Sequence, residues 1–156
     1  RQRQMCIRDS CGILTGGHII LGLPGETHDT MVAQAGMLSE LPLSTLKIHQ
    51  LQLIRGTRMA HEYEENPTGF HLFREVDEYI DLVIDYVEHL HPDLVLERFV
   101  SQSPKELLIA PDWGLKNYEF VTRLQKRMKE RGAYQGKKYR DSEKRVIFAE
   151  DNFTTE

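Results

Sequence analysis

Short apolar runs alternate with longer amphipathic stretches along most of the chain. Residues 17–23, GHIILGL, are apolar, β-branched and bounded by glycine, which predicts a buried strand. Residues 44–54, STLKIHQLQLI, alternate with the period of two that a strand requires. Residues 93–100, DLVLERFV, predict a third strand.

Stretches with helical spacing separate these strands. Residues 27–40 carry Met31, Ala35 and Leu38 on one side, and Thr27 or Asp29 can cap the helix. Residues 73–90 combine an apolar stripe with an acidic face, residues 58–65 predict a short helix, and residues 103–108 predict a helical turn. Residues 115–131 predict a basic amphipathic helix, whose charged side is either a solvated face or a contact to phosphates.

The order of these elements, strand-helix-strand-helix-strand-helix, predicts parallel strands joined by right-handed crossovers. Three strands are too few for a closed barrel, and so narrow a parallel sheet leaves faces and edges uncovered. The pattern therefore indicates part of a larger α/β unit. The alternative is a stand-alone α/β binding or interaction module without catalysis.

Composition adds limits on the environment and partners of the chain. Its 156 residues are 40% hydrophobic and carry a net charge of -4, which indicates a packed core and gives no general attraction to nucleic acid or membrane. The cysteines, Cys6 and Cys11, form no disulfide framework, so we expect a cytoplasmic protein. No apolar run approaches the roughly 18 residues of a membrane span.

Both ends of the chain differ from the middle. The opening decapeptide, RQRQMCIRDS, has no periodicity and resembles translated library-adapter sequence, so we expect residues 1–10 to be a non-native leader. The alternative is an ordinary frayed terminus. Residues 141–156 are expected to form a polar tail.

The turn after the first strand, GLPGET at residues 22–27, is the clearest candidate for a ligand contact. A phosphate-binding P-loop needs a lysine after its last glycine, but Glu26 stands there. The dinucleotide fingerprint G-x-G-x-x-G is also absent. The glycines instead predict close approach to a neutral or cationic ligand.

Three motifs in order carry a family resemblance: HIILGLPGET at 18–27, LKIHQLQLIRGT at 46–57 and LERFVSQSPKELLIAPDWGLKN at 96–117. They resemble the fifth strand, the sixth strand and the C-terminal region of radical S-adenosylmethionine (radical SAM) enzymes, in particular the Elongator-like YhcC branch. The resemblance implies an α/β fold, namely a C-terminal fragment of a partial (β/α) TIM-type barrel with a C-terminal helical extension. Residues 11–92 would be barrel units and residues 93–140 the extension.

The same resemblance implies a cofactor set and partners. The complete protein would be an enzyme that uses S-adenosylmethionine, a 4Fe–4S cluster and 5′-deoxyadenosyl radical chemistry. An electron donor such as flavodoxin or ferredoxin would serve it, and RNA is a candidate substrate. The cluster motif CxxxCxxC is missing from this chain, and Cys6 and Cys11 do not have its spacing, so we expect the chain alone to be inactive.

Residues matching the family motifs are expected to contact the cofactor, and bulk at Gly22 is expected to enter the space that the cofactor needs. The expected cofactor-binding residues are Ile20, Gly22, Pro24, Gly25, Glu26, His49 and Leu51. For Glu26 the alternative is an acid placed favourably at a helix N-terminus. His18 stands where relatives often carry aspartate.

Lys47 and Arg98 are the candidate substrate-binding residues. Lys47 shares a strand parity with His49, which faces either the barrel interior or the outer surface. Arg98 either binds a carboxylate or phosphate bidentately or forms a structural salt bridge. Trp113 is interpreted as a core or lid aromatic, with stacking on substrate as the alternative. We predict no metal site from the histidines, which lack ligand spacing: His28, His61, His71, His89 and His91.

Overall fold

The computed structural model describes residues 12–140. Its main sheet holds the parallel strands β1 (Gly16–Leu21), β2 (Thr45–Gln50) and β4 (Val95–Arg98), in the order β1-β2-β4. Helix α2 (His28–Ser39) joins β1 to β2. The predicted parallel pairing of the first two strands is confirmed, as is the mixed α/β class.

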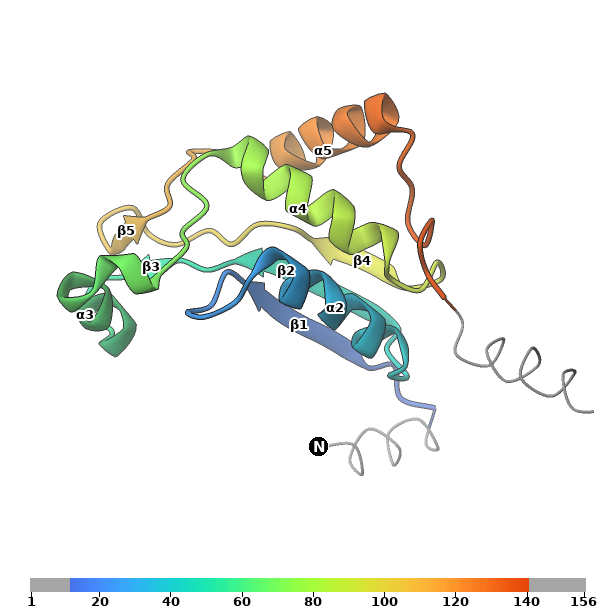
Figure 1. Cartoon of the computed structure of the whole chain (residues 1–156), viewed down its shortest axis with the longest axis horizontal. Coiled ribbons are helices and arrows are strands. Elements are labelled where there is room, and N and C mark those ends of the chain that lie inside the picture. Colours follow the sequence, from blue (N-terminus) through green and yellow to red (C-terminus); the bar gives the residue numbers. More distant parts are fainter. Residues whose placement is uncertain (1–11, 141–156) are drawn as a thin grey trace, which may run out of the picture.

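Helices lie against the sheet and against one another (Figure 1). Helix α4 (Val76–Glu88) contacts α2, and α5 (Asn117–Arg131) runs along α4. Helix α3 (Arg58–Glu65) and the short 3₁₀ helix η1 (Pro67–Gly69) lie beyond the C-terminal ends of the strands (Figure 1). Of the two predicted caps of α2, the structure uses Thr27, whose hydroxyl accepts a hydrogen bond from the Thr30 amide at 3.2 Å.

One hydrophobic core lies between the sheet and the helices. Leu21, Leu46 and Ile48 of the sheet are fully buried there, together with Tyr79 of α4 and Phe120 of α5. The core therefore draws on both proposed segments, 11–92 and 93–140. The division between those segments stays a prediction.

The predicted strand over 44–54 is wrong in its second half. Strand β2 ends at Gln50, and β3 (Leu53–Ile54) pairs antiparallel with β5 (Leu108–Ala110) in a separate small sheet. The alternation fails because Ile48, His49, Gln50 and Leu51 are all buried, which no single strand with one open face allows. Strand β5 was not predicted; the predicted turn before it is present, since the amides of 107 and 108 both donate to the Pro104 carbonyl.

Other element ends differ from the predictions by a few residues. Strand β1 stops at Leu21 because Gly22 has a φ of +90°, which leaves the extended region. The third strand is shorter than the predicted 93–100, and α4 begins at Val76 rather than residue 73. Such shifts are expected because capping and turn geometry decide where an element ends, and hydrophobic periodicity does not describe that geometry.

Charged side chains of α4 and α5 form ion pairs with one another. Arg131 donates to Asp85 at 2.9 Å and to Asp81 at 3.3 Å, and Arg127 lies 3.8 Å from Asp81. Part of the basic side of α5 is therefore engaged with α4 rather than only solvated. Arg123, on the same helix, is exposed. Contact between this helix and RNA stays a prediction.

Several expectations concern residues outside the described range: the non-native leader at 1–10, the polar tail at 141–156, Cys6 and Cys11. Among the helices of residues 12–140, none has the length and apolar character needed to cross a membrane.

Candidate functional site

The C-terminal ends of β1, β2 and β4 meet at one edge of the sheet, because the strands are parallel (Figure 1). Ligands of βα proteins bind at this edge. Three features gather here: the turn after β1, the sheet face that the helices leave uncovered, and a cleft beyond β2 and β4.

The Glu26 side chain holds the turn after β1 in shape by hydrogen bonds to its backbone. Its carboxylate accepts hydrogen bonds from the amides of Gly22 at 3.0 Å and Leu23 at 2.9 Å, and from the Gln34 side chain at 2.7 Å. Three of its hydrogen-bonding positions are therefore used by the protein. The carboxylate therefore bonds to the amides of the turn rather than to the N-terminal amides of α2, and it sets the shape of the turn.

The two glycines of the turn face different surroundings. At Gly22 a Cβ would lie 2.8 Å from the Phe73 ring, on the side of the core, and φ is +90°. Atoms added at Gly22 would therefore meet Phe73 first, and the expectation that bulk there would enter cofactor space stays a prediction. At Gly25 φ is +83° and nothing lies within 4 Å of the same atom, so only the backbone conformation favours glycine there. Pro24 and Gly25 are exposed at the tip of the turn.

The face of the sheet away from the helices is called the open face. Ile20, which is 42% exposed, lies here opposite His49, and His18 lies opposite Lys47. A register shift at the β2–β4 pairing places Arg98 opposite Lys47. The open face comprises His18, Ile20, Lys47, His49, Val95, Glu97 and Arg98.

His49 is the buried polar residue of the open face. Its Nδ1 lies 3.0 Å from Nε2 of His18, and its own Nε2 has no hydrogen-bond partner among the described residues. Burial, reinforced by the charges of His18, Arg98 and Lys47, lowers the pKa of His49 to about 4. The ring is therefore neutral at neutral pH, and its buried Nε2 makes no hydrogen bond within the described residues.

Lys47 forms an ion pair on the open face, whereas Arg98 forms none within the described residues. The Lys47 ammonium lies 3.1 Å from the Glu97 carboxylate, and hydrogen bonds from Thr45 and Lys47 lower the pKa of Glu97. Arg98 forms no ion pair within residues 12–140, so the structural salt bridge considered for it is not found there. Its guanidinium is exposed beside His49.

Leu51 does not join the other predicted cofactor residues on the open face. It is 5% exposed and lies in a second, small core with Leu53 and Leu72. The chain leaves the main sheet after Gln50, so the strand parity that links His49 to Leu51 in the sequence is lost. The Leu51 amide still donates to the Leu21 carbonyl at 2.8 Å and extends the pairing with β1.

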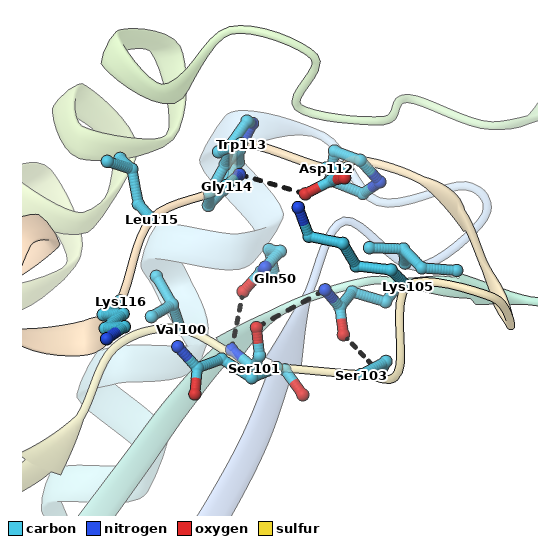
Figure 2. Close-up of a pocket in the computed structure, with 14 residues that line it drawn as sticks. Gln50, Val100, Ser101, Ser103, Lys105, Asp112, Trp113, Gly114, Leu115 and Lys116 are labelled. Carbon is cyan, nitrogen blue, oxygen red and sulfur yellow. Dashed lines mark hydrogen bonds between the residues drawn. The ribbon is translucent and has the colours of Figure 1, made fainter.

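The cleft beyond β2 and β4 was missed by sequence reasoning. It has a volume of about 320 Å³ and lies between the strand ends and the segment that leads into α5 (Figure 2). Gln50 accepts from the Ser101 amide at 3.0 Å, and Gln52 accepts from the Ser103 hydroxyl at 2.8 Å. The sequence carries no local signal for this cleft, because the paired residues Gln50 and Ser101 are 51 positions apart. Trp113, predicted to be a core or lid aromatic, packs on Tyr79 and also lines this cleft.

Within residues 12–140, no group of three or more histidine, cysteine, aspartate or glutamate side chains has the arrangement of a metal site. The described range also contains no cysteine.

Known proteins resemble this chain in sequence. The chain is 36% identical over 126 residues to the YtqA protein of Bacillus subtilis (81% of this chain, 38% of YtqA). It is 24% identical over 132 residues to the YhcC protein of Escherichia coli (84% of this chain, 41% of YhcC). The chain thus spans about two fifths of the length of these curated relatives.

A solved structure supports the fold. The archaeal Elp3 of Methanocaldococcus infernus, with an N-terminal deletion (1-46), superimposes with a TM-score of 0.69 at 13% identity, over 86% of this chain and 31% of Elp3. The family model of the Radical_SAM C-terminal domain matches residues 43–130. The chain therefore belongs to the Radical_SAM C-terminal domain family and has the α/β architecture of the C-terminal part of a radical SAM-type protein.

Proposed function

We propose that the chain is the C-terminal portion of a radical SAM enzyme and that its open face lines the binding site of S-adenosylmethionine. The observation that carries the proposal is the unpartnered Nε2 of His49, a buried atom beside the exposed apolar Ile20. A nucleoside needs this combination, because its base presents both an apolar face and hydrogen-bonding edges. The site also lies at the strand ends where βα proteins bind ligands.

The described residues fit S-adenosylmethionine but not the 4Fe–4S cluster. Ile20 and His49 would contact S-adenosylmethionine, while Glu26 holds the neighbouring turn in shape through the Gly22 and Leu23 amides. In radical SAM enzymes, reductive cleavage of this cofactor at a 4Fe–4S cluster supplies a radical that abstracts hydrogen. The described residues contain no cysteine, so they do not fit the cluster, and we assign them no part in that cleavage.

The chain's own residues prepare a site rather than carry out the bond cleavage. His49 stays neutral at neutral pH because burial lowers its pKa to about 4, so it can offer Nε2 without bringing a charge beside a sulfonium. His18 orients the ring through the contact with Nδ1. The substrate is proposed to approach Lys47 or Arg98, with an external electron donor of the flavodoxin or ferredoxin type.

The test is a chimera in which residues 12–140 replace the matching segment of YtqA. After anaerobic reconstitution with iron and sulfide, dithionite and S-adenosylmethionine should yield 5′-deoxyadenosine, with intact YtqA as the reference. Ile20→Lys should reduce the yield at least about tenfold, because a charge would be placed against the cofactor. Met37→Lys is the matched control, since Met37 is 61% exposed on α2.

A chimera that assembles the cluster but releases no 5′-deoxyadenosine would contradict the proposal and favour a non-catalytic binding module. Equal effects of the two lysine substitutions would contradict the placement of the cofactor on the open face. The 156-residue chain alone should neither acquire a cluster chromophore nor cleave the cofactor, because it lacks the CxxxCxxC motif.

A further inference from the structure

The cleft beyond β2 and β4 is held open by hydrogen bonds rather than filled by apolar side chains. Gln50 is 3% exposed, and its side-chain oxygen accepts a hydrogen bond from the Ser101 amide. The side-chain oxygen of Gln52 accepts a hydrogen bond from the Ser103 hydroxyl at 2.8 Å. Gln52 also donates to the Ser101 carbonyl at 3.4 Å. These bonds fix the wall formed by residues 100–103 against β2.

The opposite wall is fixed as well. The indole Nε1 of Trp113 donates to the carbonyls of Phe73 at 2.9 Å and Arg74 at 3.0 Å. The ring packs on Tyr79, with 5.3 Å between ring centroids, and stacks at 13° to Phe120. Trp113 thus has a set orientation, and part of it borders the cleft (Figure 2).

The lining combines apolar surface with excess positive charge. Val100, Leu108, Pro111, Trp113 and Leu115 supply the apolar part. Lys105 and Lys116 are exposed and form no ion pair within the described residues, whereas the acid in the lining, Asp112, accepts from the Gly114 amide at 3.0 Å. Figure 2 shows the Lys105 side chain reaching over the cleft toward Asp112. Two cations against one acid favour an anionic group on the ligand.

We propose that this cleft is a substrate-binding subsite for a small molecule with an apolar ring or chain and one anionic group, a carboxylate or a phosphate. Its volume of about 320 Å³ falls at the lower end of ligand pockets. The assignment to substrate rests on the proposed function. Binding of such a molecule to the cleft does not, and it can be measured without S-adenosylmethionine.

The cleft borders the proposed cofactor site through a single strand end. Residues on neighbouring positions of β2 serve the two places: His49 lies on the open face and Gln50 lines the cleft. Because consecutive side chains of a strand point to opposite faces of the sheet, a substrate held by its anionic end in the cleft would reach the cofactor around the C-terminal end of β2. This proximity is the structural reason for choosing a substrate rather than an unrelated ligand.

Trp113 is the only tryptophan in the sequence, so tryptophan fluorescence comes from a single residue that borders the cleft. The 156-residue chain would be titrated with phenyl phosphate, phenylacetate, inorganic phosphate and the uncharged 2-phenylethanol. One or both anionic aromatic probes should give a saturable change, and the relative affinities of phenyl phosphate and phenylacetate identify the anion. Inorganic phosphate and 2-phenylethanol should bind at least about tenfold more weakly.

The double variant Lys105→Met, Lys116→Met should weaken binding of the better probe by about tenfold or more. The control is Lys126→Met, Lys129→Met, two exposed lysines of α5 outside the cleft, which should bind the probe like the parent chain. Circular dichroism would verify that all variants retain the fold.

Three results would overturn the inference: no saturable change with either anionic probe, equal affinity for 2-phenylethanol, or equal loss in the two double variants. Inorganic phosphate that binds as tightly as phenyl phosphate would also overturn it, since the apolar wall would then have no role. Failure of cofactor cleavage in the chimera would leave these binding results unchanged, so the two proposals fail separately.

Discussion

The two faces of the β1-β2-β4 sheet are made from the same strands but are used differently. On the covered face, Leu46 and Ile48 are fully buried against α2, α4 and α5. On the open face, Ile20 is 42% and Val95 57% exposed, and charged side chains lie between them. The covered face accounts for the stability of the described fold, while the open face keeps polar and apolar surface available. The candidate site residues are those on the face where the chain does not complete burial and bonding.

The largest expected effect comes from truncating the same residue type on the two faces. Ile48→Ala should lower the free energy of unfolding by about 2 to 5 kcal/mol, because it opens a cavity in a fully packed core. Ile20→Ala should lower it by less than about 1 kcal/mol, since much of that side chain is already in water. Urea denaturation of both variants measures the difference. Equal losses would show that the open face is packed in solution, which would contradict the comparison.

A second contrast concerns the glycines after β1. Gly22→Ala should destabilise by about 2 to 4 kcal/mol, because a positive φ and a 2.8 Å approach to Phe73 combine. Gly25→Ala should cost about 1 kcal/mol, from the backbone conformation alone. Thermal unfolding followed by circular dichroism would rank them. The reverse order would mean that the turn points away from the core, contrary to the structure.

The smallest expected effect is a pH dependence from the open face. The pKa of His49 is lowered to about 4 from 6.5, so the unfolded chain takes up a proton first as the pH falls. Its contribution to stability is therefore complete above pH 6.5 and is lost as the pH falls from 6.5 to about 4. His49→Gln should remove that part of the pH dependence in urea unfolding.

The matched control for His49 is His61→Gln, on the exposed side of α3. This variant should keep the pH dependence of the parent chain. If His49→Gln behaved in the same way as His61→Gln, the histidine of the open face would be solvated and its Nε2 would not be available as a specific ligand contact.

Periodicity found the covered face of the sheet and the three long helices, because each buries apolar residues at the spacing of its own element. It could not place the break after Gln50 or the three-residue strand β5, since elements of two or three residues have no period to detect. The alternation of 44–54 also misassigned Leu51, which belongs to the second core rather than the open face.

The candidate site was predictable where it depends on local sequence. The turn at 22–27 was recognised, but the role of Glu26 inside it depends on the amide geometry of Gly22 and Leu23. The unpartnered state of His49 depends on all its neighbours together. The cleft could not be anticipated, since Gln50 and Ser101 are 51 positions apart in the chain and only the parallel pairing brings them together.

The central position of β2 has a consequence for synthesis of the protein on the ribosome. Its neighbours come from opposite directions in the chain, β1 before it and β4 after it. The first two strands and α2 can associate while the rest is still being made, since chain segments fold from the N-terminus as they emerge. The hydrogen bonds of Gln50 and Gln52 to residues 101–103 cannot form until those residues have been synthesised. Until those residues leave the ribosome, the nascent chain can present the open face but has no cleft in which to retain a ligand.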